Sequence, residues 1–61
     1  MKPGDRVYDP HTGQYGVILR GNEARAAQRA YLIKLDLTME RWRRHAKIAP
    51  LNKAGKPTET T

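Results

Sequence analysis

The stretch KPGDRVYDPHTGQYGVILRG, residues 2–21, contains two short apolar segments with a turn between them. Residues 5–9 alternate polar and apolar side chains, and residues 15–20 are rich in bulky and β-branched ones, so each segment predicts a strand. The sequence DPHTG between them, residues 9–13, favours a tight turn, because proline fixes φ and glycine tolerates a positive φ. The stretch therefore predicts an antiparallel hairpin.

Three more strands are predicted after this hairpin. The clearest is residues 29–37, where Tyr31 and every second residue after it is apolar. Residues 40–44 (ERWRR) and 46–51 (AKIAPL) predict two shorter strands. Gly16, inside the second predicted strand, favours a bulge or a sharp bend of the kind that small barrels need at their corners. The pattern predicts an all-β fold.

Two segments allow a second interpretation. Residues 38–46 are also compatible with a helix, because Met39, Trp42 and Ala46 are spaced by three and four. Residues 21–28 are expected to form a long hairpin loop, and their alanine and glutamate content is compatible with one or two helical turns inside it.

The 61 residues allow one domain. We expect residues 1–51 to form a small five-stranded barrel. Residues 52–61 contain no apolar side chain larger than alanine, so a disordered tail is expected there. No cysteine is present, so the core must be aliphatic and aromatic, without a disulfide or a thiolate metal site.

Alternation along the predicted strands gives a candidate core. With Tyr31, Ile33 and Leu35 pointing inward, the other inward side chains are expected to be Val7, Val17, Leu19, Trp42, Ile48 and Leu51. Ile18 and Leu32 then fall on the outer face. An adjacent apolar pair there predicts a patch for self-association or for a protein partner. The alternative is that the 21–28 loop or arginine stems cover this pair.

The net charge of +6, with arginine supplying seven of the twelve basic residues, favours an anionic partner, above all nucleic acid. The alternative is that the charge serves solubility alone. Because no recognition helix is predicted, we expect contact with phosphates and little sequence preference. The candidate contact residues lie on two hairpins: Arg41, Arg43, Arg44 and Lys47 on one, and Arg20, Arg25 and Arg29 on the other. Arg41 and Arg43 are expected to flank Trp42 and face solvent together.

Tyr8 and Tyr15 flank the first predicted turn, where their rings could stack on bases or enclose a methylated lysine. The more ordinary interpretation is that rings at such positions are partly buried in a small domain.

Nothing in the composition indicates an enzyme. The chain has no serine or cysteine nucleophile, and His11 and His45 have no evident catalytic or metal-binding partner. We therefore expect no cofactor, no metal and no small-molecule substrate. No run approaches the roughly 20 apolar residues of a membrane span, and the first residues lack the apolar region of a secretory signal, so the cytosol is the expected location. The small size of the chain suits a bacterial or phage protein.

The segments PGDRVYD, TGQYGVI, YLIKLD, RWRR and KIAPL together resemble the small SH3-like barrels of the Tudor and KOW type. The matching residues are Gly4, Asp5, Val7, Gly16, Val17, Tyr31, Ile33, Leu35, Asp36, Ile48, Pro50 and Leu51. The opening KPGDRVYDPHTGQYGVI is also similar to the Tudor-like module of CarD-type proteins, which grip RNA polymerase. That second resemblance implies docking on RNA polymerase as an alternative role, and it includes no counterpart of the helical domain of that family.

Overall fold

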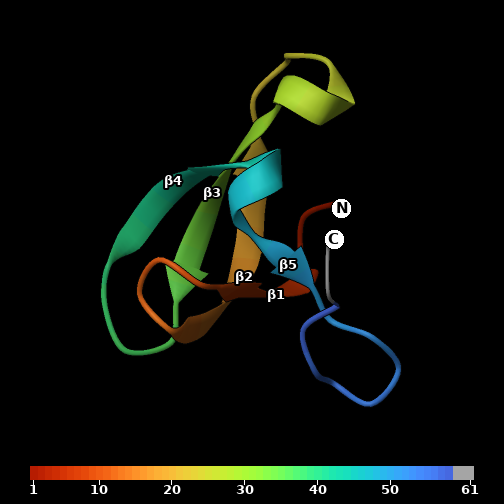
Figure 1. Ribbon diagram of the computed structural model, residues 1–61. Helices are drawn as coiled ribbons and strands as arrows, with labels where there is room; N and C mark the ends of the chain where they lie inside the picture. Colours follow the sequence, from red (N-terminus) through yellow and green to blue (C-terminus); the bar gives the residue numbers. More distant parts are fainter. Residues whose placement is uncertain (59–61) are drawn as a thin grey trace.

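The computed structural model describes residues 1–58, apart from the side chain of Ala26. Five strands and two 3-10 turns follow one another along the chain (Figure 1). In order they are β1 (Arg6–Asp9), β2 (Gln14–Gly21), η1 (Ala26–Gln28), β3 (Ala30–Leu35), β4 (Glu40–Arg44), η2 (His45–Lys47) and β5 (Ala49–Pro50). The prediction of an all-β fold with five strands is confirmed.

The strands form one antiparallel sheet in the order β4-β3-β2-β1-β5. The three hairpin pairings follow from the chain order, whereas β5 reaches the far side of β1 by crossing over from β4 through η2. The sheet curls strongly, and η2 carries the chain from the end of β4 to β5 (Figure 1). Within residues 1–58 no ladder joins β4 to β5, so these two strands are the edges of the sheet.

The predicted strand at residues 40–44 is confirmed as β4, and the alternative helix over 38–46 is wrong. Only His45–Lys47 turns, as the single 3-10 turn η2. The loop expected at 21–28 also contains one 3-10 turn, η1. The third strand ends at Leu35, earlier than predicted, and Leu37 is exposed in the connection to β4.

The β1–β2 turn is built around the side chain of Asp9. Its carboxylate accepts hydrogen bonds from the backbone nitrogen of His11 at 3.2 Å and from Oγ1 of Thr12 at 2.9 Å. The backbone nitrogen of Gly13 donates to the Asp9 carbonyl at 2.8 Å, and Gly13 takes the positive φ of 72° that favours glycine. The turn predicted from the DPHTG sequence is therefore confirmed.

The core consists of six apolar side chains inside the curl: Val7, Ile18, Tyr31, Ile33, Leu35 and Ile48. The predicted faces of β2 were wrong, because Ile18 is 1% exposed whereas Leu19 is 43% exposed. Gly16 explains the reversal. It pairs with Val7 and Leu35 on the inner face, and a Cβ there would lie 2.7 Å from Cγ2 of Ile33, so the absent side chain makes room for the core.

β2 contains a bulge, although not at Gly16. Ile18 pairs with Ile33, but the next pairing joins Arg20 to Leu32, so β2 has one extra residue, Leu19. The bulge places Arg20 rather than Leu19 directly opposite Leu32. The bulge therefore places the Arg20 side chain on the outer face, next to Leu32.

The segment predicted as a disordered tail, residues 52–61, begins with a hydrogen-bonded turn. The Asn52 side chain accepts from the backbone nitrogens of Ala54 and Lys56, and Leu51 forms an isolated bridge with Pro57. The backbone nitrogen of Thr58 then donates to the Pro50 carbonyl at 2.9 Å. Residues 59–61 of the predicted tail lie outside the described residues.

Candidate nucleic-acid interface

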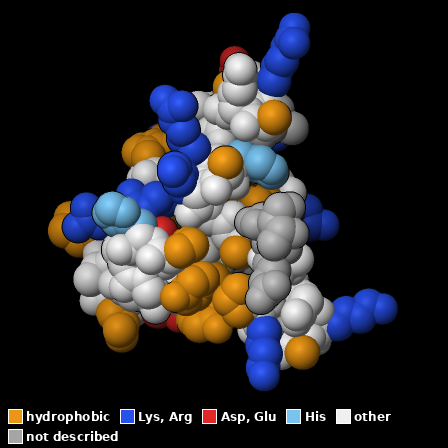
Figure 2. Space-filling model, in the orientation of Figure 1, with side chains coloured by type: hydrophobic (Ala, Val, Ile, Leu, Met, Phe, Trp, Pro, Cys, Tyr) orange, Lys and Arg blue, Asp and Glu red, His pale blue; other side chains and the backbone are white. Residues whose placement is uncertain are grey.

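The seven basic candidates do not form one surface. They come from β2, the β2–β3 connection, β4 and η2, and in the view of Figure 2 the Lys and Arg side chains are spread around the molecule rather than gathered in one block. Their local environments therefore decide which of them a ligand can reach.

Arg43 is held by a buried carboxylate. Its Nε donates to both oxygens of Asp9 at 3.3 Å, and its Nη1 donates to the Trp42 carbonyl at 3.0 Å. Asp9 is 0% exposed and the Arg43 side chain only 17% exposed. The expectation that Arg43 faces solvent beside Arg41 was wrong, because pairing with Tyr31 directs Arg43 toward the inner face.

This ion pair spans the curl of the sheet. Arg43 lies on the edge strand β4, Asp9 ends β1, and two strands separate β1 from β4 in the sheet order. The contact therefore links strands that no ladder joins. We call it the Asp9–Arg43 clasp.

Arg25 and Arg29 lie in the connection between β2 and β3. Nε of Arg29 donates to the Ala24 carbonyl at 3.1 Å, so this half-buried side chain stabilises the loop. Arg25 is exposed. Arg41 and Lys47 are exposed as well. Because η1 contacts η2, the loop that contains Arg25 lies near the turn that contains Lys47.

The outer face of β2, β3 and β4 contains an aromatic side chain with basic neighbours. Arg20 pairs with Leu32, and Leu32 pairs with Trp42, so these three side chains lie in one row across the sheet. Arg44, two residues beyond Trp42, shares this face. We call Arg20, Leu32, Trp42 and Arg44 the Trp42 platform.

Trp42 is 45% exposed, so the expectation that it belongs to the core was wrong. The guanidinium carbon of Arg20 lies over the indole, 5.3 Å from the ring centroid, within the range of a cation–π contact. The bulge of β2 makes this contact possible, because it turns Arg20 to the face that Trp42 occupies. A planar cation and a large aromatic ring thus meet on an open sheet surface.

The predicted apolar patch of Ile18 and Leu32 does not exist as such. Ile18 is a core residue, and Leu32 alone lies on the outer face, half-buried in the Trp42 platform. The apolar component of this face is therefore Leu32 with Trp42.

Tyr8 and Tyr15 pair across β1 and β2 and are both half-buried. Their rings make an edge-on contact with centroids 5.2 Å apart and an interplanar angle of 60°. Each ring thus already has an aromatic neighbour, and stacking on a base stays a prediction for this pair.

A second ion pair occupies Arg6, so the charge of this arginine is also already paired within the protein. Nη1 and Nη2 of Arg6 donate to the two oxygens of Asp36 at 2.9 and 2.8 Å. This hydrogen bonding holds the pKa of the Asp36 carboxyl below its ordinary value and raises the pKa of Arg6. The pair is exposed, so it neutralises local charge at the surface.

Within residues 1–58, no three His, Cys, Asp or Glu side chains come together in a way that could hold a metal ion. Over the same part of the chain, no helix has the length and apolar character to span a bilayer. Comparison with known proteins gives no match to any family model, curated protein or solved structure.

The sequence analysis missed the roles of two residues: Trp42, which belongs to this surface, and Asp9, which holds Arg43 on the other face of β4. Trp42 was assigned to the core, since nothing local to ERWRR tells which face of β4 is covered. Asp9 was treated only as a turn residue. The Asp-Pro-x-Thr-Gly pattern did signal an aspartate that accepts hydrogen bonds from its own turn, but gave no sign of Arg43, 34 residues away.

Proposed function

We propose that the protein is a non-catalytic module that binds single-stranded nucleic acid. Bases stack on the Trp42 platform, and exposed arginine and lysine side chains contact phosphates. The observation that carries the proposal is the guanidinium of Arg20 lying over the exposed ring of Trp42, with Arg44 on the same face. Aromatic rings and arginine planes on an open sheet are the usual stacking surface for unpaired bases.

The electrostatics support phosphate contact with little sequence preference. The clasp and the Arg6–Asp36 pair neutralise two arginines, whereas Arg20, Arg25, Arg41, Arg44 and Lys47 are exposed and form no ion pair among the described residues. Contacts to phosphate oxygens fix the position of a strand and carry no sequence information directly. The set that remains is smaller than the seven candidates, and two of its members, Arg20 and Arg44, lie on the Trp42 platform.

We also propose that the curled sheet is an SH3-like barrel of the Tudor and KOW type. Five antiparallel strands, a bulge in β2 and a short last strand that returns to β1 support this assignment.

Intrinsic fluorescence offers a direct test, because Trp42 is the only tryptophan. Single-stranded DNA and RNA oligonucleotides and a matched duplex should be titrated at 50 and 200 mM salt. We expect quenching by single strands, weaker quenching by the duplex, and a log–log salt slope of about −2 if three phosphates are contacted.

Variants separate stacking from charge when binding is followed by the anisotropy of a labelled oligonucleotide. Trp42→Ala should weaken binding by about 5- to 150-fold, the range for loss of one stacked base. Arg44→Ala should weaken binding and make the salt slope shallower by about 0.7. Lys53→Ala, an exposed charge in the C-terminal turn, is the matched control and should change neither quantity.

Equal affinity of Trp42→Ala and wild type would contradict the proposal. Sedimentation of the free protein tests the alternative of a protein partner. If the wild-type protein is a dimer, Leu32→Ser is a monomer and oligonucleotides cause no quenching, the Trp42 platform is the contact surface for a second copy of the chain.

A further inference from the structure

A separate pocket lies on the other side of β4 from the Trp42 platform. It has a volume of about 440 Å³ and opens between the β1–β2 turn, η2 and the start of β5. Its lining combines apolar and basic side chains: Pro10, His11, Arg43, Ala46, Lys47, Ile48 and Ala49. The volume lies in the range of pockets that hold small ligands.

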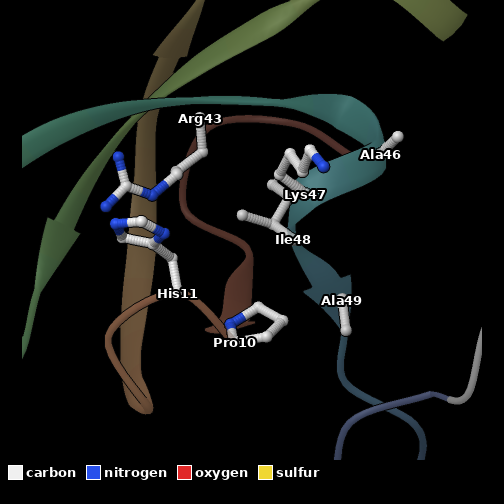
Figure 3. Close-up of a pocket in the computed structure, with 7 residues that line it drawn as sticks. All are labelled: Pro10, His11, Arg43, Ala46, Lys47, Ile48 and Ala49. Atoms are coloured by element: carbon white, nitrogen blue, oxygen red, sulfur yellow. The ribbon is translucent and has the colours of Figure 1, made fainter.

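The basic side chains lie at two places around an apolar wall. In Figure 3 the Arg43 guanidinium and the His11 ring lie side by side, with Lys47 and Ile48 across the pocket. The side chain of Ile48 points into the space between these two basic groups, and Pro10 lies at the opposite rim. The pocket thus offers donors at two ends and apolar contact between them.

Arg43 can donate to a ligand while it holds Asp9. The clasp uses Nε, and Nη1 donates to the Trp42 carbonyl. Nη2 donates to no group among residues 1–58 that the structure describes. No carboxylate of residues 1–58 lines the pocket, and the Asp9 charge next to Arg43 is compensated by that arginine, so Lys47 gives the pocket a positive balance.

We propose that this pocket binds one nucleotide of a nucleic-acid strand, with its two flanking phosphates at the two basic ends. Arg43 and His11 contact one phosphate, Lys47 contacts the next, and the nucleoside between them packs against Ile48 and Pro10. Two phosphates on either side of a base with an apolar face are the repeating chemistry of a polynucleotide, and this matches the order of charge and apolar surface around the pocket.

The inference rests on the proposed function, because it concerns the same strand. Trp42 and Arg44 lie on the outer face of β4, whereas Arg43 lies on the inner face. Since β4 is an edge strand, a flexible chain can leave the Trp42 platform, pass over the free edge and enter the pocket.

The minimal probe is adenosine 3′,5′-bisphosphate, compared with adenosine 5′-monophosphate and inorganic phosphate in titrations followed by amide NMR. We expect the bisphosphate to shift the amide signals of His11 and of residues 46–49, and to bind about tenfold more tightly than the monophosphate, one charge-assisted hydrogen bond being at stake. Lys47→Ala should abolish that difference, and His11→Ala should weaken both ligands. Lys53→Ala is the control and should behave as wild type. Arg43 is left unchanged in these variants because it also holds Asp9.

Equal affinity for the two nucleotides in the wild-type protein would overturn the inference, and so would shifts confined to the Trp42 platform. Oligonucleotide quenching of Trp42 that persists in that case would leave the proposed function standing. Conversely, bisphosphate binding at the pocket without any quenching by oligonucleotides would contradict the proposed function and support the pocket as a nucleotide site.

Discussion

Replacing Arg43 with methionine should lower the free energy of unfolding by about 3 kcal/mol, because it leaves a buried carboxylate without its counter-charge. Asp9 is 0% exposed, and Arg43 is its one salt-bridge partner among the described residues. Removing one partner of a buried pair typically costs about 3–5 kcal/mol. The low end applies because the Nε–oxygen distances of 3.3 Å are long, and the donors from His11 and Thr12 remain.

That loss is large for this chain. A domain of 61 residues has a stability of roughly 3–9 kcal/mol at the usual value per residue. A loss of 3 kcal/mol also corresponds to a fall in Tm of about 12 °C or more for a domain of this size. Urea unfolding should be followed by far-UV circular dichroism, because the adjacent Trp42 could report the substitution itself.

Arg44→Met is the matched control, since Arg44 is the next residue of β4 and is exposed on the outer face. It should change the stability by no more than about 0.5 kcal/mol. In a double variant, Asp9→Asn should recover part of the stability lost in Arg43→Met, because the buried charge is removed with its partner. A loss below about 1 kcal/mol in Arg43→Met, with an unchanged m-value, would refute the assignment of Arg43 as a structural residue.

Three further predictions concern the sheet and its surface charges. Ile18→Ala should cost about 2–5 kcal/mol in urea unfolding, whereas Leu19→Ala should cost less than about 1 kcal/mol; the reverse order would mean that the faces of β2 are exchanged. Gly16→Ala should cost about 1–3 kcal/mol in thermal unfolding, because its Cβ would meet the Lys34 carbonyl oxygen at 2.7 Å; unchanged stability would contradict this close approach. Since the Asp36 pKa is lowered on folding, the stability that Asp36 contributes is present above the ordinary aspartate pKa of about 3.9 and is lost as pH falls through the lowered value. Wild type should thus exceed Asp36→Asn in stability at pH 7 and lose that advantage in acid, and a constant difference across a pH series would exclude the linkage.

Local sequence signals predicted the elements of the fold well. The DPHTG turn, the strand at 40–44 and the alternation from Tyr31 each depend on residues close together in the chain, and all three are confirmed. The faces were harder to predict because β2 has aliphatic side chains on both sides. Alternation shows which residues share a face but not which face is covered, and here the deciding residue was Gly16, through its contact with Ile33.

The candidate site was predictable only in part. The basic segment ERWRR was identified, but a run of arginines does not reveal which members point inward. Arg43 is turned inward by its register with Tyr31 and held by Asp9, and the Arg20–Trp42 contact depends on a bulge that shifts the register. Register and long-range ion pairs arise from the packing of whole strands, so a single strand sequence does not encode them.

The clasp has a consequence for how the protein behaves at high concentration. β4 is a free edge, and the Trp42 carbonyl points away from β3, since the neighbouring residues of β4 make the ladder hydrogen bonds. Arg43 donates to this carbonyl, and Arg41 and Arg44 place two exposed positive charges on the same strand. A strand from another molecule would therefore find an acceptor already occupied and would meet electrostatic repulsion, which protects the sheet from edge-to-edge growth into fibrils.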